Sequence, residues 1–410
     1  MGVDAVGLGR RRGRPGSPER LQGSPLPPRP NTFVLHAFGE TLLRDLPIGH
    51  YPAGYFGKGG KSAQYWSSTP GHNTIVVDGR SQRDDLVSRA YLREFLYGGP
   101  GDDLRGVSSA APAAAPEPGV GCDYALSDAR EVYPDKISKA LRHVLYVRGA
   151  AGAAGRADPG YFVIVDELAA DAATDFDWRA HSGGQVRLGE EYLSVVADSG
   201  ALAIFPLLPT GWRADEGQYA DDARFIRIAP PRSTTSVLFV TLLVPVRHVA
   251  TREGGGTGAR PIPRTSLPEV VTLPREDGLD FYVRRAGHTD SVTVRTHAEG
   301  PAAVTLVTQS AGGQVMRAGL FGAREARLGP RQLVGSPEPV VATLWVDGDA
   351  VRGRVSGQAG PLTLDLALGI APTSTVPSGD WNGKEKTFRL AVPAGSKAVP
   401  VRLEGCGGLG

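Results

Sequence analysis

The chain has 410 residues and a mass of 43.1 kDa, which is enough to bury one large hydrophobic core or two smaller ones. Lysine and arginine number 45 against 43 aspartates and glutamates, so the net charge of +2 provides no field that would favour nucleic acid or a membrane surface. Glycine and proline, with 55 and 33 residues, exceed a fifth of the chain and predict a protein rich in turns and strands.

Residues 1–30 form a head that is rich in arginine, glycine and proline, as in RRRGRPGSPER (10–20). This composition predicts disorder, because it offers few apolar side chains to bury. The head has no apolar run of the kind that a signal peptide needs, so we expect no signal peptide there. Nor does the chain contain 18 consecutive apolar residues, so we expect no membrane-spanning segment.

From Asn31 onward the apolar stretches are short, and many alternate with a period of two. In SVTVRTH (291–297), for example, Val292 and Val294 share one face of a strand. The predicted strands lie in 31–38, 73–79, 143–149, 161–168, 201–208, 236–246, 291–297, 303–310, 342–348 and 362–368. Only 85–96 and 216–223 suggest a helical turn. The pattern therefore predicts an all-β fold, a large antiparallel β-sandwich of the supersandwich kind.

Three regions are expected along the chain: the disordered head (1–30), a β-sandwich domain (31–335) and a small carboxy-terminal β appendage (336–410). The second boundary is placed in GPRQLVGSPEP (329–339), which is rich in turn-forming residues.

Three further stretches of low complexity, at 107–120, 149–160 and 252–264, are rich in alanine, glycine and proline. They are interpreted as loop insertions at hairpin tips. Such loops could cover a substrate or be tolerated expansions.

Several common site motifs are excluded. GYFGKGGKS (54–62) resembles a phosphate-binding loop, but Tyr55 stands where the first glycine belongs and no strand-to-helix unit surrounds it. The basic residues are dispersed along the chain, which argues against nucleic-acid binding. Cys122 and Cys406 cannot form a disulfide framework; a single bridge is possible, but two separate thiols are expected.

Three blocks of sequence follow one another in a recognisable order. They are NTFVLHAFGETLLRD (31–45), then WSSTPGHNTIVVDGRSQ (66–82), then YPDKISKALRHVLYVR (133–148) with YFVIVDEL (161–168) and FDWRAHS (176–182). Over roughly residues 31–345 the chain resembles the carboxy-terminal β domain of the heparinase II/III-like polysaccharide lyases. Members of this family act on heparan, alginate, chondroitin or hyaluronan, so the resemblance implies an acidic polysaccharide as partner, but it does not select one.

The resemblance also implies a reaction. Such lyases neutralise the carboxylate of a uronic acid, withdraw the proton at C5 with a tyrosine or histidine, and expel the sugar linked at O4. In the family the base and the neutralising groups come mostly from an α/α-toroid that precedes the β domain. A His-x-His pair at the start of the β domain supplies one catalytic histidine and one zinc ligand.

This chain departs from the family pattern at the His-x-His pair. Counting back from Asn31, the two histidine positions fall on Pro25 and Pro27, and the aspartate position of that motif falls on Arg29. Because only about 30 residues of disordered composition precede the first predicted strand, we expect no toroid in this chain. We therefore expect a truncated or frame-shifted product that is inactive alone, with no catalytic residue assigned.

Asp45 and His72 match two zinc ligands of the family. Zinc takes three or four protein ligands, so the implied zinc site is incomplete in this chain. His50 could replace the missing ligand if its turn folds back. Otherwise, Asp45 and His72 would form a hydrogen-bonded polar pair under a loop.

Candidate substrate-binding residues are Asn73, Gln82 and Tyr51. Asn73 and Gln82 are polar groups at strand ends and could face a sugar or cap their own turns. Tyr51, like Tyr55, could stack on a sugar ring or pack at the edge of the core.

The remaining matches are interpreted as structural. His143 and His181 are expected to be hydrogen-bonded histidines within strands, and Trp178 and Trp345 are expected in the core. Trp66 could belong to either the core or the site.

The alternative function is a non-catalytic carbohydrate-binding or structural β module, or a remnant without function. The resemblance implies a periplasmic or secreted location, although the sequence carries no signal. It does not indicate an oligomeric state.

Overall fold

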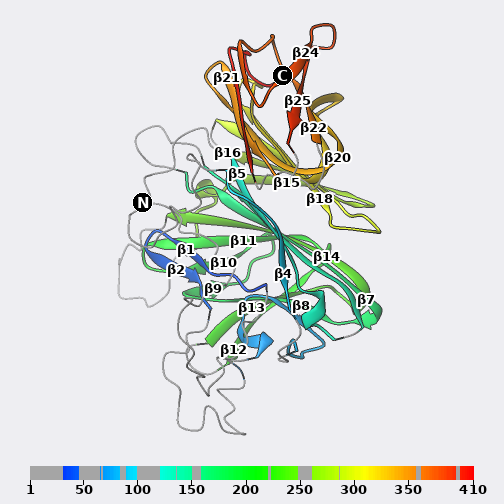
Figure 1. The fold of residues 1–410 in the computed structure, drawn as a ribbon. Coiled ribbons are helices and arrows are strands. Elements are labelled where there is room, and N and C mark those ends of the chain that lie inside the picture. Colours follow the sequence, from blue (N-terminus) through cyan, green and yellow to red (C-terminus); the bar gives the residue numbers. More distant parts are fainter. Residues whose placement is uncertain are drawn as a thin grey trace, which may run out of the picture. The chain divides into compact units, whose positions relative to one another are not determined.

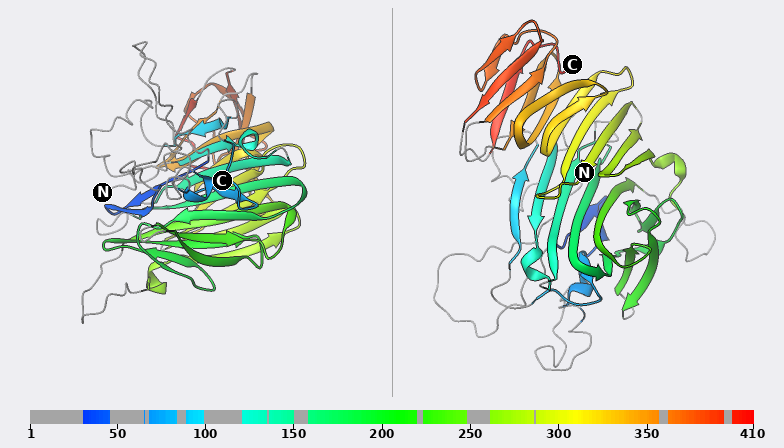
Figure 2. Two further views of the ribbon diagram at one scale, coloured as in Figure 1. Left: turned by 90° about the horizontal axis from the view of Figure 1, so that it is seen from below. Right: turned by 90° about the vertical axis from the view of Figure 1, so that its right-hand side faces the viewer.

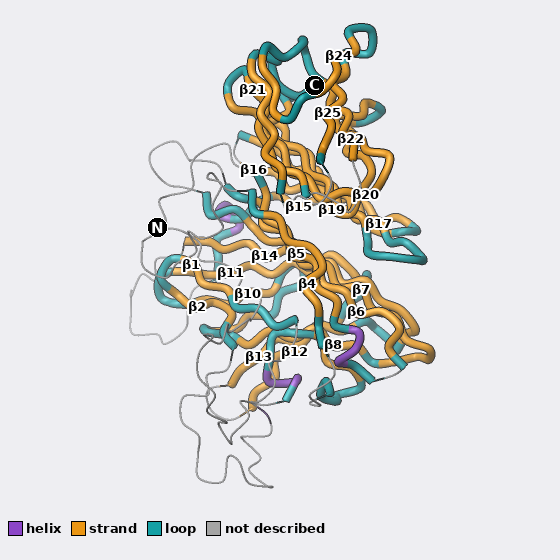
Figure 3. Tube along the Cα trace, viewed as in Figure 1, coloured by secondary structure: helices purple, strands orange, loops and turns teal. Residues whose placement is uncertain are grey.

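The computed structural model describes residues 31–45, 65, 68–83, 89–98, 121–134, 136–149, 158–219, 223–247, 261–285, 287–356, 362–393 and 398–410. Strands dominate these residues (Figure 3). The helical elements with described bounds are three 3-10 turns, η1 (Thr69–Gly71), η3 (Arg130–Val132) and η5 (Arg264–Ser266). The predicted all-β class with large antiparallel sheets is confirmed.

The chain forms two compact units, each built from discontinuous segments (Figure 1). Unit 1 comprises residues 1–93, 126–143 and 163–267, and unit 2 comprises residues 94–125, 144–162 and 268–410. The predicted boundary at 335/336 falls inside a single strand, β20 (Arg331–Asp347), which belongs wholly to unit 2. The predicted disordered head, 1–30, lies outside the described residues.

The first large sheet has eight strands in the order β4-β5-β6-β7-β14-β11-β10-β9. Their bounds are β4 (Tyr91–Leu96), β5 (Cys122–Asp128), β6 (Ile137–Val147), β7 (Tyr161–Thr174), β14 (Thr234–Arg247), β11 (Gly200–Leu208), β10 (Leu193–Val196) and β9 (Gln185–Arg187). Long curved strands lie side by side in it (Figure 2). The first eight residues of β7 are all buried, as in a strand that is covered on both faces.

Unit 1 contains a four-stranded sheet in the order β12-β13-β8-β3. These strands are β12 (Arg213–Tyr219), β13 (Ala223–Ala229), β8 (Phe176–His181) and β3 (Ile75–Val77). A separate hairpin pairs β1 (Leu35–Ala37) with β2 (Glu40–Leu43). In β8 the apolar side chains of Phe176, Trp178 and Ala180 are fully buried, whereas Asp177 and Arg179 point to the other face and are partly exposed.

The predicted Asp-Gly turn after β3 is present. Asp78 and Gly79 have φ angles of 49° and 65°, which is the left-handed region that a tight two-residue turn requires and that glycine adopts without strain. The turn is anchored because Asp78 Oδ1 accepts a hydrogen bond of 3.0 Å from the backbone N–H of Asp175. This turn fixes where β3 ends.

The second large sheet lies in unit 2 and has twelve strands. Its main path is β15 (Glu269–Arg275), β16 (Gly278–Arg285), β17 (His288–Arg295), β18 (Ala303–Ser310), β19 (Val315–Leu328), β20, β21 (Ala350–Val355), β26 (Val399–Glu404) and β23 (Ser374–Val376). A branch from β20 adds β22 (Leu362–Ala367), β25 (Thr387–Val392) and β24 (Gly379–Asn382). The alternation predicted for 291–297 is seen in β17, where Val292 and Val294 are buried.

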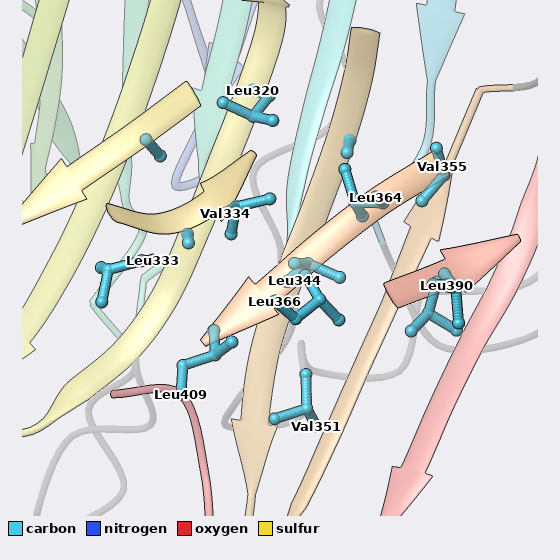
Figure 4. Close-up of a cluster of buried hydrophobic side chains, with 14 of the residues drawn as sticks. Leu320, Leu333, Val334, Leu344, Val351, Val355, Leu364, Leu366, Leu390 and Leu409 are labelled. Carbon is cyan, nitrogen blue, oxygen red and sulfur yellow. The ribbon is translucent and has the colours of Figure 1, made fainter. Parts of the chain in front are cut away.

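A core of aliphatic side chains holds the carboxy-terminal strands of unit 2 together. Leu320, Leu344, Leu364 and Leu390, on β19, β20, β22 and β25, each expose 1% or less of their surface and belong to one cluster of buried side chains (Figure 4). Burial of such side chains is the main force that folds this sheet, since each contributes about 1.5–3 kcal/mol. Both cysteines are free and buried, as the expectation of two separate thiols requires.

Three expectations are corrected. Tyr91–Leu96 and Arg213–Tyr219 are strands, not helical turns, because pairing with neighbouring strands overrides their weak helical pattern. Trp178 is in the core, but Trp345 is only partly buried, because it lies where the buried run of β20 ends at Leu344. No helix with the length and hydropathy to cross a membrane is found among the described residues.

Candidate functional site

The segment His72-Asn73-Thr74 enters β3 from the short turn η1. The backbone N–H of His72 donates to the carbonyl of Thr69 (3.1 Å), and the N–H of Thr74 donates to the carbonyl of His72 (3.0 Å). The Oγ1 atom of Thr69 accepts a hydrogen bond of 2.6 Å from the backbone N–H of Gln82. These bonds close the loop on itself and hold His72 in one place.

Asp45 and His72, 27 residues apart, are brought together. The distance between Asp45 Oδ1 and His72 Nδ1 is 2.6 Å, and both side chains remain in contact with solvent. The two predicted zinc ligands therefore meet, but they bond directly to each other. Among the residues that the structure describes, no third histidine, cysteine or carboxylate completes a metal-binding group. His50, the proposed substitute, lies outside the described residues.

The donors that are present fall short of a zinc site, because two ligands are fewer than the three or four that zinc takes. Zinc binding at Asp45 and His72 stays a prediction.

Asn73 is fully buried, and its side chain uses all of its hydrogen-bonding capacity. The Nδ2 atom donates to the carbonyls of Phe33 (2.7 Å) and Arg44 (3.1 Å). The Oδ1 atom accepts from the backbone N–H of His181 (2.6 Å) and from its Nδ1 (3.2 Å). Asn73 thus ties three chain segments together, which is a structural role. The predicted contact of Asn73 with a sugar stays a prediction.

A buried ion pair between Arg142 and Asp166 lies next to the motif segments that contain Asn31 and Asn73. The Nε and Nη2 atoms of Arg142 on β6 donate to the two carboxylate oxygens of Asp166 on β7, at 2.5 and 3.0 Å. The Nη1 atom donates to the carbonyls of Asn31 and Asn73, the second at 3.1 Å. The guanidinium also lies over the ring of Phe33, 5.3 Å from its centroid. Arg142 therefore fixes the backbone on both sides of the motif.

His143 lies next to Arg142 and points to the opposite face of β6. It is buried, and its Nε2 atom lies 2.9 Å from Glu167 Oε1. This agrees with the interpretation of His143 as a structural histidine.

His181 at the end of β8 is also buried, and it contacts a residue that sequence reasoning did not select. The hydroxyl of Tyr65 lies 3.0 Å from His181 Nε2. Since Nδ1 of His181 faces the acceptor Oδ1 of Asn73, the network places the imidazole proton on Nδ1, and Nε2 accepts from Tyr65. Tyr65 also stacks on Tyr219, with ring centroids 4.0 Å apart and an angle of 9°.

The electrostatics of this pair follow from burial. Burial, together with the electrostatic effects of His72, Arg179 and Arg44, lowers the pKa of His181 to about 3. Burial raises the pKa of Tyr65 to about 12, although Arg179 opposes this shift through its charge and a hydrogen bond. At neutral pH both residues are therefore uncharged.

Gln82 and Tyr51 complete the predicted set. Gln82 is buried, and its side chain forms a hydrogen bond with Tyr133, a buried residue on the turn before β6. The role of Gln82 at a sugar stays a prediction. Tyr51, together with Tyr55 and Trp66, lies outside the described residues.

The residues that the sequence did not identify are Tyr65, Arg44 and Arg179. Arg179 follows Trp178 within FDWRAHS, and Arg44 precedes the matched Asp45. A possible signal was the placement of an arginine directly beside two motif residues.

No protein-family model and no curated protein matches this chain. Solved structures that are similar to it include a mutant of the heparan sulfate lyase HepC from Pedobacter heparinus, with 13% identity and a TM-score of 0.42 over 71% of this chain and 36% of the solved chain. A heparinase III with methylated lysines has 13% identity and a TM-score of 0.42, over 70% and 35% of the two chains. Another heparinase III has 12% identity and a TM-score of 0.40, over 68% and 35%.

The resemblance to heparinases that the motifs indicate is thus found again among solved structures. This chain spans little more than a third of the length of those proteins. At such identity and TM-score the likeness establishes neither an activity nor a substrate.

Proposed function

We propose that this chain is the β-sandwich portion of a lyase that cleaves uronic-acid-containing polysaccharides by β-elimination. The observation that carries the proposal is the contact between Asp45 and His72, which lie 2.6 Å apart beside the buried Asn73. These three residues belong to two separate motif blocks of the lyase resemblance, and the fold brings them together. Asp45, His72 and Asn73 define this corner of the sandwich. A chance match of motifs would give no reason for them to meet.

The chemistry of the corner supports substrate binding better than proton abstraction. A general base works best when its pKa lies near the operating pH. The pKa of Tyr65, at about 12, and that of His181, at about 3, both lie far from neutrality. Pro25 and Pro27 stand where the family has its histidine pair. We therefore propose that the chain by itself turns over no substrate.

We propose that Asp45 and His72 bind a zinc ion weakly. Two protein ligands leave the ion largely to water, so affinity is expected to be well below that of a complete site. Titration of the chain with zinc in the presence of a competing metal indicator measures this affinity. Asp45→Ala and His72→Ala are each expected to abolish it, and tight binding that survives both changes would refute the assignment.

The test of the lyase proposal is the absorbance of the unsaturated uronide product, measured with alginate, heparan sulfate, chondroitin and hyaluronan. The unaltered chain is compared with a version that carries Pro25→His, Pro27→His and Arg29→Asp, and with longer versions that include any upstream coding sequence. Product is expected only from a restored version, and it should fall when His72→Gln is added. Product from the unaltered chain would contradict its proposed inactivity.

The second candidate is a non-catalytic carbohydrate-binding module, favoured by the stacked pair Tyr65 and Tyr219 beside the corner. Glycan binding without product from any restored version would support it. By resemblance to the lyases we propose a periplasmic or secreted location, which fractionation of the source cells would test.

A further inference from the structure

The hairpin formed by β24 and β25 in unit 2 (Figure 1) turns at an asparagine that a glycine follows. Asparagine occurs at positions 31, 73 and 382, and only Asn382 precedes a glycine, since threonine follows the other two. Asn382 and Gly383 are both exposed, and Asn382 lies opposite Thr387 at the last pair of the hairpin. Water therefore reaches this Asn-Gly pair, which belongs neither to the core nor to the candidate site.

The side chain of Asn382 folds back onto the turn. Its Oδ1 atom accepts hydrogen bonds from the backbone N–H groups of Lys384 (3.1 Å) and Glu385 (3.3 Å). Its Nδ2 atom donates to Oε2 of Glu385 at 2.9 Å. Two backbone donors thus converge on the side-chain carbonyl oxygen, and a carboxylate holds the amide nitrogen.

The two backbone donors favour attack on the side-chain amide of Asn382. When a nucleophile adds to Cγ, negative charge develops on Oδ1, and hydrogen-bond donors that are already in place stabilise that charge. The backbone nitrogen of Gly383 is a nucleophile within the same chain, and its attack closes a five-membered ring without bringing a second molecule into position. Gly383 has no side chain to obstruct the approach, and glycine reaches the backbone conformations for ring closure with little strain.

We propose that Asn382 is a site of spontaneous deamidation that alters the β24–β25 turn. The Gly383 nitrogen loses its proton to water or hydroxide and bonds to Cγ of Asn382. The bond between Cγ and Nδ2 then breaks, and the amide nitrogen takes up a proton from water and leaves as ammonia. Water opens the cyclic imide at either carbonyl, which leaves aspartate or isoaspartate at position 382. One water is consumed and one ammonia is released, without an oxidant or a reductant, and the proposal does not rest on the proposed function.

The product changes the turn, because a hydrogen-bond donor is replaced by a negative charge. Where Nδ2 now donates to Glu385 at 2.9 Å, an aspartate would place one carboxylate oxygen against another. Like charges this close repel each other, so the contact should open. Next to the turn, Trp381 pairs with Phe388, and both side chains contact the core of the carboxy-terminal strands. Deamidation should therefore loosen this end of the hairpin.

The first measurement is the rate of deamidation in the full chain. The protein is incubated in mildly alkaline buffer, and peptide mapping by mass spectrometry follows the conversion of each asparagine. We expect conversion at Asn382 to be about ten-fold or more faster than at Asn31 and Asn73, because glycine leaves the attacking nitrogen unhindered. Gly383→Ala should slow conversion at Asn382 by about ten-fold for the same reason. The rate in the folded chain should equal or exceed the rate in urea, because unfolding separates Oδ1 from its two donors.

The second measurement is hydrogen exchange of the backbone amides of β24 and β25 at low ionic strength. Asn382→Asp reproduces the aspartate product and should speed exchange by about two- to five-fold, as expected for a like-charge contact at an exposed position. Adding Glu385→Gln to Asn382→Asp should restore the slower exchange, since the glutamine amide donates to the new carboxylate. Gln309→Glu, which adds the same charge to the turn between β18 and β19, is the matched control and should leave exchange in β24 and β25 unchanged.

Two results would overturn the deamidation site: conversion at Asn382 no faster than at Asn31, or a rate in the folded chain well below the rate in urea. Exchange in Asn382→Asp that matches the wild type, or that stays fast when Glu385→Gln is added, would reject the effect on the turn. Neither measurement involves a polysaccharide. Failure of the lyase assay would therefore leave this site in place, and failure of these measurements would leave the proposed function in place.

Discussion

Asn73 and His181 lie 108 residues apart in the sequence, and Asn73 Oδ1 accepts hydrogen bonds from both the backbone N–H and the Nδ1 atom of His181, at 2.6 and 3.2 Å. This one amide joins the turn before β3 to the end of β8. Through its Nδ2 atom it also reaches Phe33 and Arg44. Asn73 is thus the point at which the separate motif blocks are fastened together.

The first prediction concerns this amide. Asn73→Ala leaves several buried backbone groups without partners, so the free energy of unfolding should fall by about 3 kcal/mol or more. Asn382→Ala, which removes an exposed asparagine that caps its own turn at Lys384, is the control and should cost less than about 1 kcal/mol. Urea unfolding followed by tryptophan fluorescence measures both. Similar losses in the two variants would contradict the role assigned to Asn73.

The second prediction compares two ion pairs of similar geometry. Arg142–Asp166 is buried, whereas Arg389–Asp365 is largely exposed, and both are bidentate. Asp166→Ala leaves a buried guanidinium unpaired and should cost about 3–5 kcal/mol of unfolding free energy. Asp365→Ala should cost about 1 kcal/mol or less, because water screens the exposed pair. Chemical denaturation of both variants gives the comparison, and an Asp166→Ala loss as small as that of Asp365→Ala would show that the buried pair is not required.

The third prediction concerns pH. The pKa of His181 falls from 6.5 to about 3 on folding, so between these values the unfolded chain binds a proton that the folded chain does not. Stability should therefore decrease as pH is lowered through this window, by at most about 1.4 kcal/mol for each pH unit. His181→Gln should flatten the dependence of unfolding free energy on pH.

Part of the slope should remain in that variant, because burial also lowers the pKa of His288. Unfolding free energies of the wild type and the variant, measured from pH 7 to pH 4, test this prediction. A wild-type slope that persists in His181→Gln would mean that protonation of other groups dominates.

The fourth prediction uses two glycines. At Gly217 a Cβ would lie 2.1 Å from the Phe225 ring, which is confined by Arg179 and His181, so Gly217→Ala should cost about 1–3 kcal/mol. At Gly312 the nearest atom is Ser310 Oγ at 3.8 Å, so Gly312→Ala should be nearly neutral. Thermal melting separates the two. In Gly217→Ala, near-ultraviolet circular dichroism should also change, since the Tyr65–Tyr219 stack borders Phe225; an unchanged spectrum and melting temperature would argue against the confinement of the Phe225 ring.

Much of the fold was predictable, because the side-chain pattern of a strand can be read from its own few residues. Alternation in SVTVRTH predicts β17, and the continuous apolar run in YFVIVDEL predicts the buried first half of β7. Where the local signal was weak, as at Tyr91–Leu96, prediction failed. There the conformation depends on pairing with the neighbouring strand, and the residues of a single segment do not show which strand it pairs with.

The sequence alone determined strands with a clear local pattern, such as β7 and β17, the Asp-Gly turn after β3 and the order of motifs that includes Asp45 and His72. Only the tertiary structure decided that Tyr65 meets His181 across 116 residues and that the Nε atoms of Arg44 and Arg179 lie buried without acceptors in the described chain. The physical reason is that side-chain alternation and turn chemistry act over a few residues. Contacts between distant segments depend on which strands pair and in what register.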